Sequence, residues 1–192
     1  LVLHSATKYL CGHSDAMGGV LAGSRELVQK VFHFREINGA SLQADPAYMI
    51  ARGMKTLELR IFRQNESAMK IANYLNGHSK VSQVFYPGLE THTGHAIARS
   101  QMRGYGGMLS FALDGAYDLV EKFLPSLKLV HLAASLGSVS TLAGPPRTTS
   151  HVELTEEQRA QLGIPESLIR YSVGIESVDD LLFDLEQALK KI

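Results

Sequence analysis

The sequence predicts an α/β protein, and two observations support this prediction. From Val81 onward, short apolar runs typical of strands alternate with segments of helical periodicity, which indicates a sheet covered by helices on one face. Before that, residues 47–76 contain no proline and a single glycine, Gly53, which indicates one long helix or two helices joined at a bend. Hydrophobic residues make up 45% of the 192 residues, enough to bury a core.

The N-terminal segment predicts two strands and a helix. Residues 1–3 (LVL) are expected to be the end of a buried strand, and residues 19–23 (GVLAG) a second short buried strand. Ser24 offers its side chain as the N-cap of the helix that follows. The apolar face of that helix would carry Leu27, Val28, Val31 and Phe32.

The rest of the chain predicts further strands and helices. Strands are expected at residues 81–86, 108–113, 127–132 and 168–175, and helices around residues 95–102 and 117–124. Thr155 and Gln158 form a capping-box pattern before a short helix that ends at Gly163. Ser177 and Asp180 form a second such pattern before the last helix.

Two domains are expected, residues 1–60 and residues 61–192, with the boundary inside the long helix. The sequence starts within an apolar run at Leu1, as if a strand had been cut at its beginning. We therefore expect the N-terminal half of the protein to be missing from this chain.

The composition argues against several classes of function. Lys and Arg together number 19, as do Asp and Glu, so no net charge favours nucleic acid or an anionic membrane surface. No apolar stretch approaches the ~20 residues that a membrane-spanning helix needs. The single cysteine, Cys11, cannot form an internal disulfide, which indicates a reducing compartment, and a cytoplasmic protein is expected.

Residues 5–9 (SATKY) place a lysine and two hydroxyl groups directly after the first predicted strand. Partial burial there would favour the neutral amine of Lys8, which is the form that condenses with an aldehyde. Ser5 and Thr7 supply hydroxyl donors that suit an anionic group such as a phosphate. The alternative is a solvated lysine in a polar loop, and these five residues alone favour that alternative.

Separated motifs along the chain resemble those of one known family. Residues 1–14 (LVLHSATKYLCGHS) are similar to the signature around the cofactor lysine in the Cys/Met metabolism, or trans-sulfuration, family of pyridoxal-phosphate (PLP) enzymes. Further similar motifs are YPGL at residues 86–89 with His92 and His95, QM and GGM at residues 101–108, SLG at residues 135–137, and RYSVGIE at residues 170–176. The matches follow the family's order and cover essentially the whole chain.

The resemblance implies a fold and a cofactor. The fold would be that of the type I PLP-dependent transferases, which is the aspartate-aminotransferase-like fold. Residues 1–60 would be the end of the large PLP-binding domain, which carries the Schiff-base lysine. Residues 61–192 would be the small C-terminal α/β domain.

The resemblance also implies roles for single residues. Lys8 would hold PLP covalently and then move protons between substrate carbons, while Ser5 and Thr7 would bind the cofactor phosphate. Arg170 would hold the substrate α-carboxylate, since a guanidinium fork suits that planar anion. Ser135 would assist beside the same carboxylate.

The implied activity is elimination or replacement at the γ-carbon of a sulfur amino acid or an O-acyl-homoserine, as in cystathionine γ-synthases and γ-lyases. The alternatives are O-acyl-homoserine sulfhydrylase or methionine γ-lyase chemistry and, from another class, a non-catalytic scaffold. The implied partners are a small amino-acid substrate, the missing N-terminal half, and further copies in a homotetramer built as a dimer of dimers. These 192 residues alone are expected to be inactive.

The chain departs from the family at one position beside the SLG motif. Members that act on cystathionine commonly have a glutamate there, and this chain has Ala134. A methyl group cannot pair with the distal ammonium of cystathionine, so Ala134 favours a shorter tail such as a thioether or an O-acyl ester. Ser138, Ser140 and residues 143–147 (AGPPR) also differ from the family pattern.

Two further patterns are given structural roles. His92 and His95 have the spacing of a metal pair, but no accompanying ligand set is evident, and no metal is expected. Residues 103–107 (RGYGG) resemble a phosphate-binding loop, but they precede a predicted strand rather than a helix. A tight turn is therefore expected there.

Overall fold

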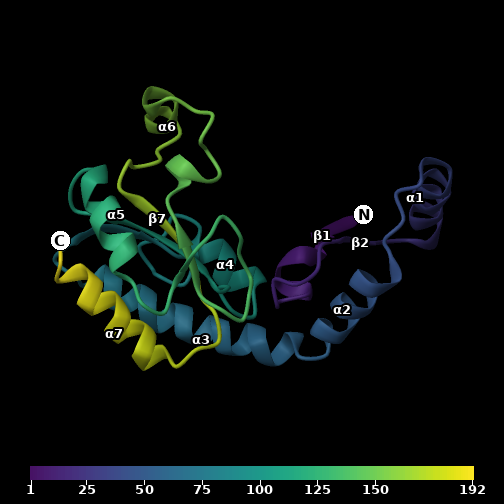
Figure 1. Cartoon of the computed structure of the whole chain (residues 1–192), viewed down its shortest axis with the longest axis horizontal. Helices are drawn as coiled ribbons and strands as arrows, with labels where there is room; N and C mark the ends of the chain where they lie inside the picture. The colour runs from purple at the N-terminus through teal and green to yellow at the C-terminus, as the bar shows by residue number, and fades with distance from the viewer. The chain divides into compact units, whose positions relative to one another are not determined.

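The computed structural model describes all 192 residues, and the chain divides after Glu58 into two units, Leu1–Glu58 and Leu59–Ile192 (Figure 1). We call them unit 1 and unit 2 and describe each by itself. The division falls close to the boundary expected at residue 60. The assignment of the units to a large and a small domain of a PLP enzyme remains a prediction.

Unit 1 contains a two-stranded antiparallel sheet. Strand β1 (Val2–Ser5) pairs with β2 (Gly19–Ala22), and a single π-helical turn, η1 (Ala6–Leu10), follows β1 directly. The prediction that β1 is buried is wrong for this chain, because every residue of the strand is exposed. The physical reason is that β2 is its only neighbour in the sheet, while the small core of the unit forms at the turn, around Ala6, Cys11 and Ile50.

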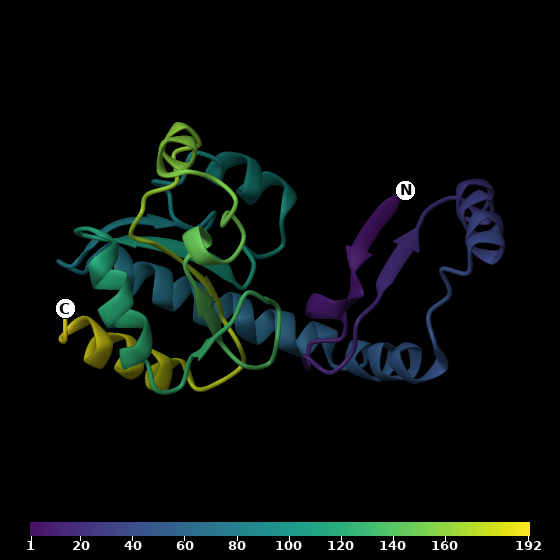
Figure 2. The same ribbon diagram turned by 45° about the horizontal axis from the view of Figure 1, so that its top comes forward.

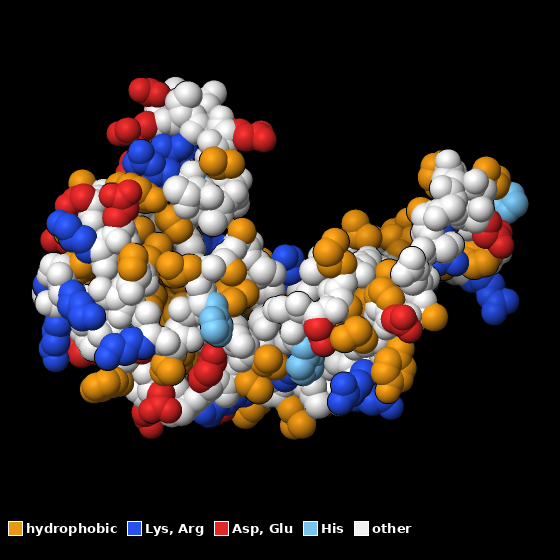
Figure 3. All heavy atoms as spheres, in the orientation of Figure 1, with side chains coloured by type: hydrophobic (Ala, Val, Ile, Leu, Met, Phe, Trp, Pro, Cys, Tyr) orange, Lys and Arg blue, Asp and Glu red, His pale blue; other side chains and the backbone are white.

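Helix α1 (Arg25–Asn38) begins and ends as the sequence indicates. Its N-cap is Ser24, whose hydroxyl accepts the N–H of Leu27, and Gly39 closes it in the left-handed conformation with φ of 70°. None of its residues is buried, and apolar side chains lie at the surface of unit 1 in Figure 3. The predicted apolar face therefore exists but is only partly covered within unit 1.

The long helical stretch is two helices, which confirms the second of the two expected forms. Helix α2 (Ala44–Met54) ends in a turn in which Thr56 N–H donates to the carbonyl of Gly53, and α3 (Leu57–Asn76) follows at once. The unit boundary lies in the first turn of α3. No helix of the structure is both long and apolar enough to cross a membrane.

Unit 2 is built on a five-stranded sheet in the order β3-β4-β7-β6-β5. The strands are β3 (Val81–Phe85), β4 (Met108–Leu113), β5 (His131–Leu132), β6 (Leu142–Gly144) and β7 (Leu168–Ser172). All neighbours are antiparallel except β5 and β6. The bounds of β4 match the prediction, whereas the three-residue β6 was not predicted.

The expected strand at residues 127–132 is mostly wrong. Only His131 and Leu132 form β5. The N–H groups of Lys128 and Leu129 instead donate to the carboxylate of Asp184, at 2.9 Å to Oδ1 and 3.0 Å to Oδ2. A side chain thus takes the donors that a neighbouring strand would use.

Helices and short turns connect these strands. They are α4 (His95–Gln101), α5 (Tyr117–Phe123), α6 (Glu156–Gln161) and α7 (Val178–Leu189), with 3₁₀ turns η2 (Leu124–Ser126) and η3 (Pro146–Thr148). The capping box of Thr155 and Gln158 is confirmed, because both of its hydrogen bonds are formed. The second predicted box is wrong, because the side chain of Ser177 makes no capping hydrogen bond.

The core of unit 2 lies between the sheet and α3, α5 and α7. In Figure 2, α3 and α7 run side by side along the sheet. Phe111 of β4 packs edge-on against Phe123 of α5, with ring centroids 5.9 Å apart, and Tyr171 of β7 is fully buried beside it. Because successive strand residues point to opposite faces, Arg170 lies on the other face of the sheet from Tyr171.

Helices α3 and α7 are joined at the surface by Glu186. Its carboxylate accepts a hydrogen bond from the Tyr74 hydroxyl and lies 2.9 Å from Lys190 Nζ and 3.4 Å from His78 Nε2. The hydrogen bond from Tyr74, with that from Lys190, lowers the pKa of Glu186 from 4.5 to about 2. The ionised carboxylate therefore stabilises the fold above pH 4.5, and this stabilisation is lost as the pH falls toward 2.

The first prediction follows from this pKa. Glu186→Gln should lower the thermal unfolding temperature at pH 7, and the difference from wild type should shrink as the pH is lowered from 5 to 2. Thermal melts followed by circular dichroism across this pH range measure it. Glu90→Gln, at an exposed glutamate outside the ion pairs, is the control and should melt like wild type. A difference in unfolding temperature that stays constant with pH would contradict the lowered pKa of Glu186.

Candidate active site

The segment that carries Lys8 is held by backbone hydrogen bonds on both sides. The N–H groups of Ala6 and Thr7 donate to the carbonyl of Gly18, at 2.8 and 3.2 Å, so the pairing of β1 with β2 extends into the turn. Beyond Lys8, Gly12 N–H donates to the Lys8 carbonyl at 2.8 Å. Lys8 itself is half-buried, with φ of −90° and ψ of −123° that depart from the helical values of its neighbours. The lysine is thus presented from an ordered backbone and not from a loose loop.

The two hydroxyls predicted to bind phosphate differ in their surroundings. Thr7 Oγ1 accepts the N–H of Gly18 at 3.0 Å and lies 3.4 Å from the Gly18 carbonyl, to which it can donate. Ser5 is exposed at the end of β1 and makes no capping bond to the turn. Since the Thr7 contact to the carbonyl is long, both hydroxyl protons can turn toward an anion.

Helix α2 supports this segment through Gly53, a residue whose role the sequence analysis missed. A Cβ at Gly53 would lie 2.1 Å from the carbonyl oxygen of Cys11, which is a backbone atom. The backbone after Lys8 therefore rests directly on α2, and only glycine allows this approach. The available signal was that Gly53 is the only glycine within residues 47–76.

Hydrogen bonds also order the chain around Cys11. The Cys11 Sγ atom lies 3.1 Å from Asp15 Oδ1, and His13 Nδ1 lies 2.7 Å from the Cys11 carbonyl. Cys11 is a free, buried thiol. Through these contacts, His13 and Asp15 order the loop after Lys8.

In unit 2, Arg170 extends from the middle of the sheet and is half-buried. Its Nη2 donates to the carbonyl of Ser135 at 2.9 Å and approaches the carbonyl of Ala133 at 3.4 Å. Burial lowers the pKa of the Arg170 guanidinium from its ordinary value, and no carboxylate of the chain forms an ion pair with it. Its remaining N–H donors are therefore suited to an external anion.

The SLG residues lie next to Arg170. Gly137 has φ of 76°, in the left-handed region, and its N–H donates to Ser172 Oγ at 2.8 Å. From α3, Gln64 Nε2 donates to the carbonyl of Ser138 at 2.9 Å, a contact across 74 residues that the sequence did not reveal. The structure thus brings Ser135 and Arg170 together, through the Ser135 main chain.

The predicted site residues form two groups. Ser5, Thr7 and Lys8 are neighbours in unit 1, and Ser135 and Arg170 are neighbours in unit 2. Their roles toward a cofactor and a substrate remain predictions.

The two histidines considered as a metal pair make local hydrogen bonds. His92 Nδ1 accepts the N–H of Gly94 at 3.0 Å, and His95 Nδ1 lies 2.8 Å from the carbonyl of Pro87. The His95 ring also stacks on Tyr105, with centroids 5.7 Å apart. In the neighbouring turn, Gly106 has φ of 87°, which agrees with the tight turn expected at residues 103–107.

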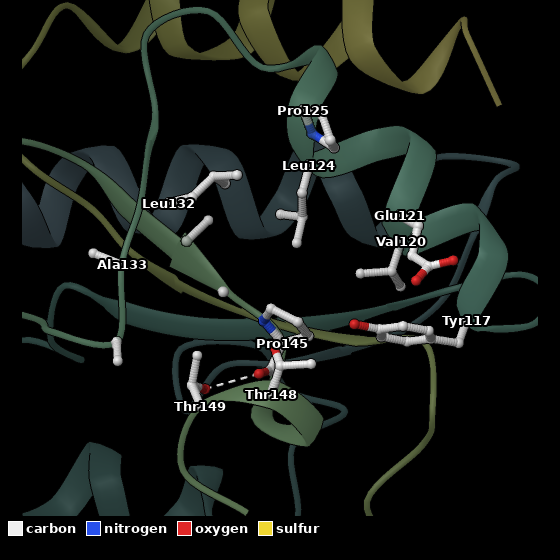
Figure 4. A pocket seen from close by; sticks show the side chains of 13 residues that line it. Tyr117, Val120, Glu121, Leu124, Pro125, Leu132, Ala133, Pro145, Thr148 and Thr149 are labelled. Carbon is white, nitrogen blue, oxygen red and sulfur yellow. Dashed lines mark hydrogen bonds between the residues drawn. The ribbon is translucent and has the colours of Figure 1, made fainter. Parts of the chain in front are cut away.

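Ala134 lines a largely apolar pocket of about 460 Å³ in unit 2. Figure 4 shows side chains of α5 on one side of it and those of the turn at residues 145–149 on another. Glu121 is the only charged residue in its lining, which consists of Tyr117, Val120, Glu121, Leu124, Pro125, Leu132, Ala133, Ala134, Ala143, Gly144, Pro145, Thr148 and Thr149. Ala133 connects the pocket to Arg170, because its carbonyl approaches the guanidinium.

Comparison with protein families gives one match over nearly the whole chain. The model of the family described as Cys/Met metabolism PLP-dependent enzymes matches residues 1–190. Among curated relatives, an L-methionine γ-lyase of Fusobacterium nucleatum subsp. polymorphum is 44% identical over an alignment of 194 residues that covers 100% of this chain and 49% of that protein. A cystathionine γ-lyase of Bacillus subtilis is also 44% identical, over 100% of this chain and 51% of that protein.

Solved structures agree with this match. The cystathionine γ-synthase of Xanthomonas oryzae pv. oryzae in complex with cystathionine has a TM-score of 0.94 and 43% identity, covering 99% of this chain and 49% of that one. A cystathionine γ-lyase of Lactobacillus plantarum complexed with L-serine has a TM-score of 0.93 and 39% identity, covering 100% of this chain and 50% of that one. The chain thus spans about half the length of these relatives.

The second prediction concerns the support of the lysine segment. Gly53→Ala should push the Cys11 carbonyl away from α2 and destabilise unit 1 by about 1–3 kcal/mol or more, since the clash is with backbone. Urea denaturation of the purified protein measures this loss. Gly19→Ala is the matched control in the same unit, because a Cβ there meets only the His4 carbonyl at 3.9 Å. Equal stability of the two variants would show that Gly53 does not support the segment.

Proposed function

The chain belongs to the family of Cys/Met metabolism PLP-dependent enzymes, and from this premise we propose that the whole protein is a trans-sulfuration enzyme. It would eliminate or replace a substituent at the γ-carbon of a sulfur amino acid or an O-acyl-homoserine. The observation that carries this proposal is Arg170, a half-buried guanidinium anchored on backbone carbonyls and without a carboxylate partner in the chain. Such a group is suited to the α-carboxylate of an amino acid.

The donor set of unit 1 fits pyridoxal phosphate. Lys8 offers an amine on an ordered, half-buried backbone, and Ser5 and Thr7 offer hydroxyl protons for the phosphate. When bound, the cofactor supplies an aldehyde for amines and an electron sink that acidifies the substrate Cα–H. Because the chain spans about half the length of its relatives, we propose that further phosphate and ring contacts come from residues beyond these 192.

The remaining chemistry belongs to side chains of this chain. Lys8 would accept the proton from the substrate Cα and return it at a neighbouring carbon. Arg170 binds the α-carboxylate through the N–H groups that the carbonyls of Ser135 and Ala133 leave available. This fixes the orientation of the substrate during the transfers.

Methionine γ-lyase or O-acyl-homoserine sulfhydrylase activity is the second candidate, and Ala134 favours it. The pocket that Ala134 lines is largely apolar, and its one carboxylate, Glu121, belongs to α5. A thioether or O-acyl tail would be compatible with such surroundings, whereas the distal ammonium of cystathionine would lose a partner.

A non-catalytic scaffold is the candidate of another class. It would need neither the lysine segment nor an unpaired guanidinium, and a half-buried charge without a counter-ion lowers stability. The retention of both Lys8 and Arg170 therefore argues for a catalytic protein.

For the whole protein we further propose a homotetramer, completed by the half that this chain lacks, and a cytoplasmic location. The proposal of missing partners is supported by the exposed strand β1 and by α1, whose apolar residues are not buried. The free thiol of Cys11 is the form found in reducing compartments.

The third prediction tests the cofactor. The full-length protein should be yellow, and borohydride reduction should fix the cofactor to Lys8, as read by mass spectrometry of the peptide. Lys8→Ala should abolish this covalent link, while Lys30→Ala, at an exposed lysine of α1, should retain it. A colourless wild-type protein that takes up no added PLP would support the scaffold instead.

The fourth prediction tests the role of Ala134. Ammonia and keto-acid release should be measured with cystathionine, methionine, cysteine and O-acyl-homoserines. Ala134→Glu should shift kcat/KM toward cystathionine over methionine by about tenfold, since a charged hydrogen bond is worth about 1.5–3 kcal/mol. Ala134→Gln, of similar size without the charge, is the matched control. An equal effect of both substitutions would show that Ala134 acts by size and not by charge.

A further inference from the structure

Two segments of unit 2, residues 135–141 and residues 170–176, are joined by hydrogen bonds at several points. At one end, Arg170 Nη2 donates to the carbonyl of Ser135 at 2.9 Å. Next along the pair, Gly137 N–H donates to Ser172 Oγ at 2.8 Å. The segment that positions Arg170 is therefore fixed on the same strand that carries Arg170.

At the other end, the carboxylate of Glu176 joins the two segments by accepting hydrogen bonds from Thr141. Glu176 Oε1 accepts the N–H of Thr141 at 2.6 Å, and Glu176 Oε2 accepts the Thr141 hydroxyl at 2.7 Å. The same hydroxyl oxygen accepts the N–H of Gly174 at 2.9 Å. Thr141 is fully buried, so its hydroxyl is used as donor and acceptor with no solvent to replace either contact.

The backbone at this end is closely packed. A Cβ at Gly174 would lie 2.3 Å from both Glu176 Oε2 and the carbonyl of Val139, and 2.6 Å from Thr141 N. Ile175 N–H also donates to that Val139 carbonyl, at 2.8 Å. The position of residues 139–141 is therefore set by a few short contacts of which the carboxylate makes two.

Glu176 is not used in an ion pair. No Lys, Arg or His lies within salt-bridge distance of its carboxylate, and its negative charge is met by the two donors of Thr141. Hydrogen bonds to a charged acceptor are stronger and more directional than those between neutral groups. This arrangement holds a segment in one geometry, which a solvated surface glutamate would not do.

We propose that Glu176 is a positioning residue: through Thr141 it holds residues 135–141 so that the Ser135 carbonyl keeps the Arg170 guanidinium aligned for a substrate carboxylate. The inference rests on the proposed function, because it needs Arg170 to bind that carboxylate. Two-point binding of a carboxylate depends on the angle of the guanidinium plane. Releasing Thr141 would let the Ser135 carbonyl move and would widen the range of that angle.

The test uses the full-length holoenzyme and two ligands that differ only at the relevant group. Glycine has an α-carboxylate, and glycinamide has a neutral amide in its place. Dissociation constants for both are measured from the change in the visible absorbance of the cofactor. Glu176→Gln should weaken glycine about tenfold and leave glycinamide within about twofold, since only the carboxylate contact is misaligned.

Further variants separate positioning from general loosening. Thr141→Val, which removes the bridging hydroxyl, should behave like Glu176→Gln. Thr141→Ser keeps the hydroxyl and should bind glycine as the wild type does. Arg170→Lys measures how much glycine binding is lost when the guanidinium itself is removed. Glu153→Gln, at an exposed glutamate, is the control. Because both ligands are compared in one preparation, a reduced folded fraction does not change their ratio.

The outcomes distinguish this inference from the proposed function. Equal weakening of glycine and glycinamide, or no weakening of either, with normal wild-type binding would overturn the role of Glu176 alone. A wild-type protein that takes up no PLP would contradict the proposed function and this inference with it.

Discussion

Strand β7 is the element on which the rest of unit 2 depends, because its two faces serve two different purposes. Ile169 and Tyr171 are fully buried and form the centre of the core with α3, α5 and α7. Arg170, between them in the chain, points to the opposite face and pairs across the sheet with Ser110 and Gly144. The burial that stabilises the fold therefore also fixes the position of the guanidinium. A shift of the β7 register by one residue would turn Arg170 toward the core and the apolar side chains away from it.

In unit 1, the segment that carries Lys8 is also held by main-chain contacts, although the contacts are of a different kind. There is no large core there, and the lysine segment is ordered by the Gly18 carbonyl and by the close approach of Cys11 to Gly53. In both units, main-chain atoms therefore hold the segment or side chain in place. Support by main-chain atoms uses no additional side chain, so it is compatible with the ligand-binding roles proposed for Lys8 and Arg170.

What the sequence predicts well is local, and what it misses depends on residues far apart in the chain. The Ser24 cap and the Thr155 capping box involve residues three apart, and both form as expected. The strand expected at residues 127–132 is shortened because Asp184 takes two of its backbone donors, and no local pattern reveals a partner so distant. Likewise Gln64 had no local signal, and Glu176 was visible only as the last residue of the RYSVGIE motif, with no role indicated; both hold the segment that carries the SLG motif. The motifs point to Ser135 and Arg170, while their supports become visible only in three dimensions.

The charges of Arg170 and Glu176 indicate why neutral groups hold the segments at residues 135–141 and 170–176. Arg170 and Glu176 lie on one segment with opposite charges, yet each is met by neutral groups, Arg170 by carbonyls and Glu176 by the donors of Thr141. An ion pair between them would satisfy both charges, but a substrate carboxylate would then have to displace a partner that is permanently present. Neutral anchors instead leave the guanidinium charge uncompensated, and burial lowers the pKa of Arg170 accordingly. A half-buried guanidinium without a counter-ion lowers stability, and in the proposed function a bound carboxylate would restore it.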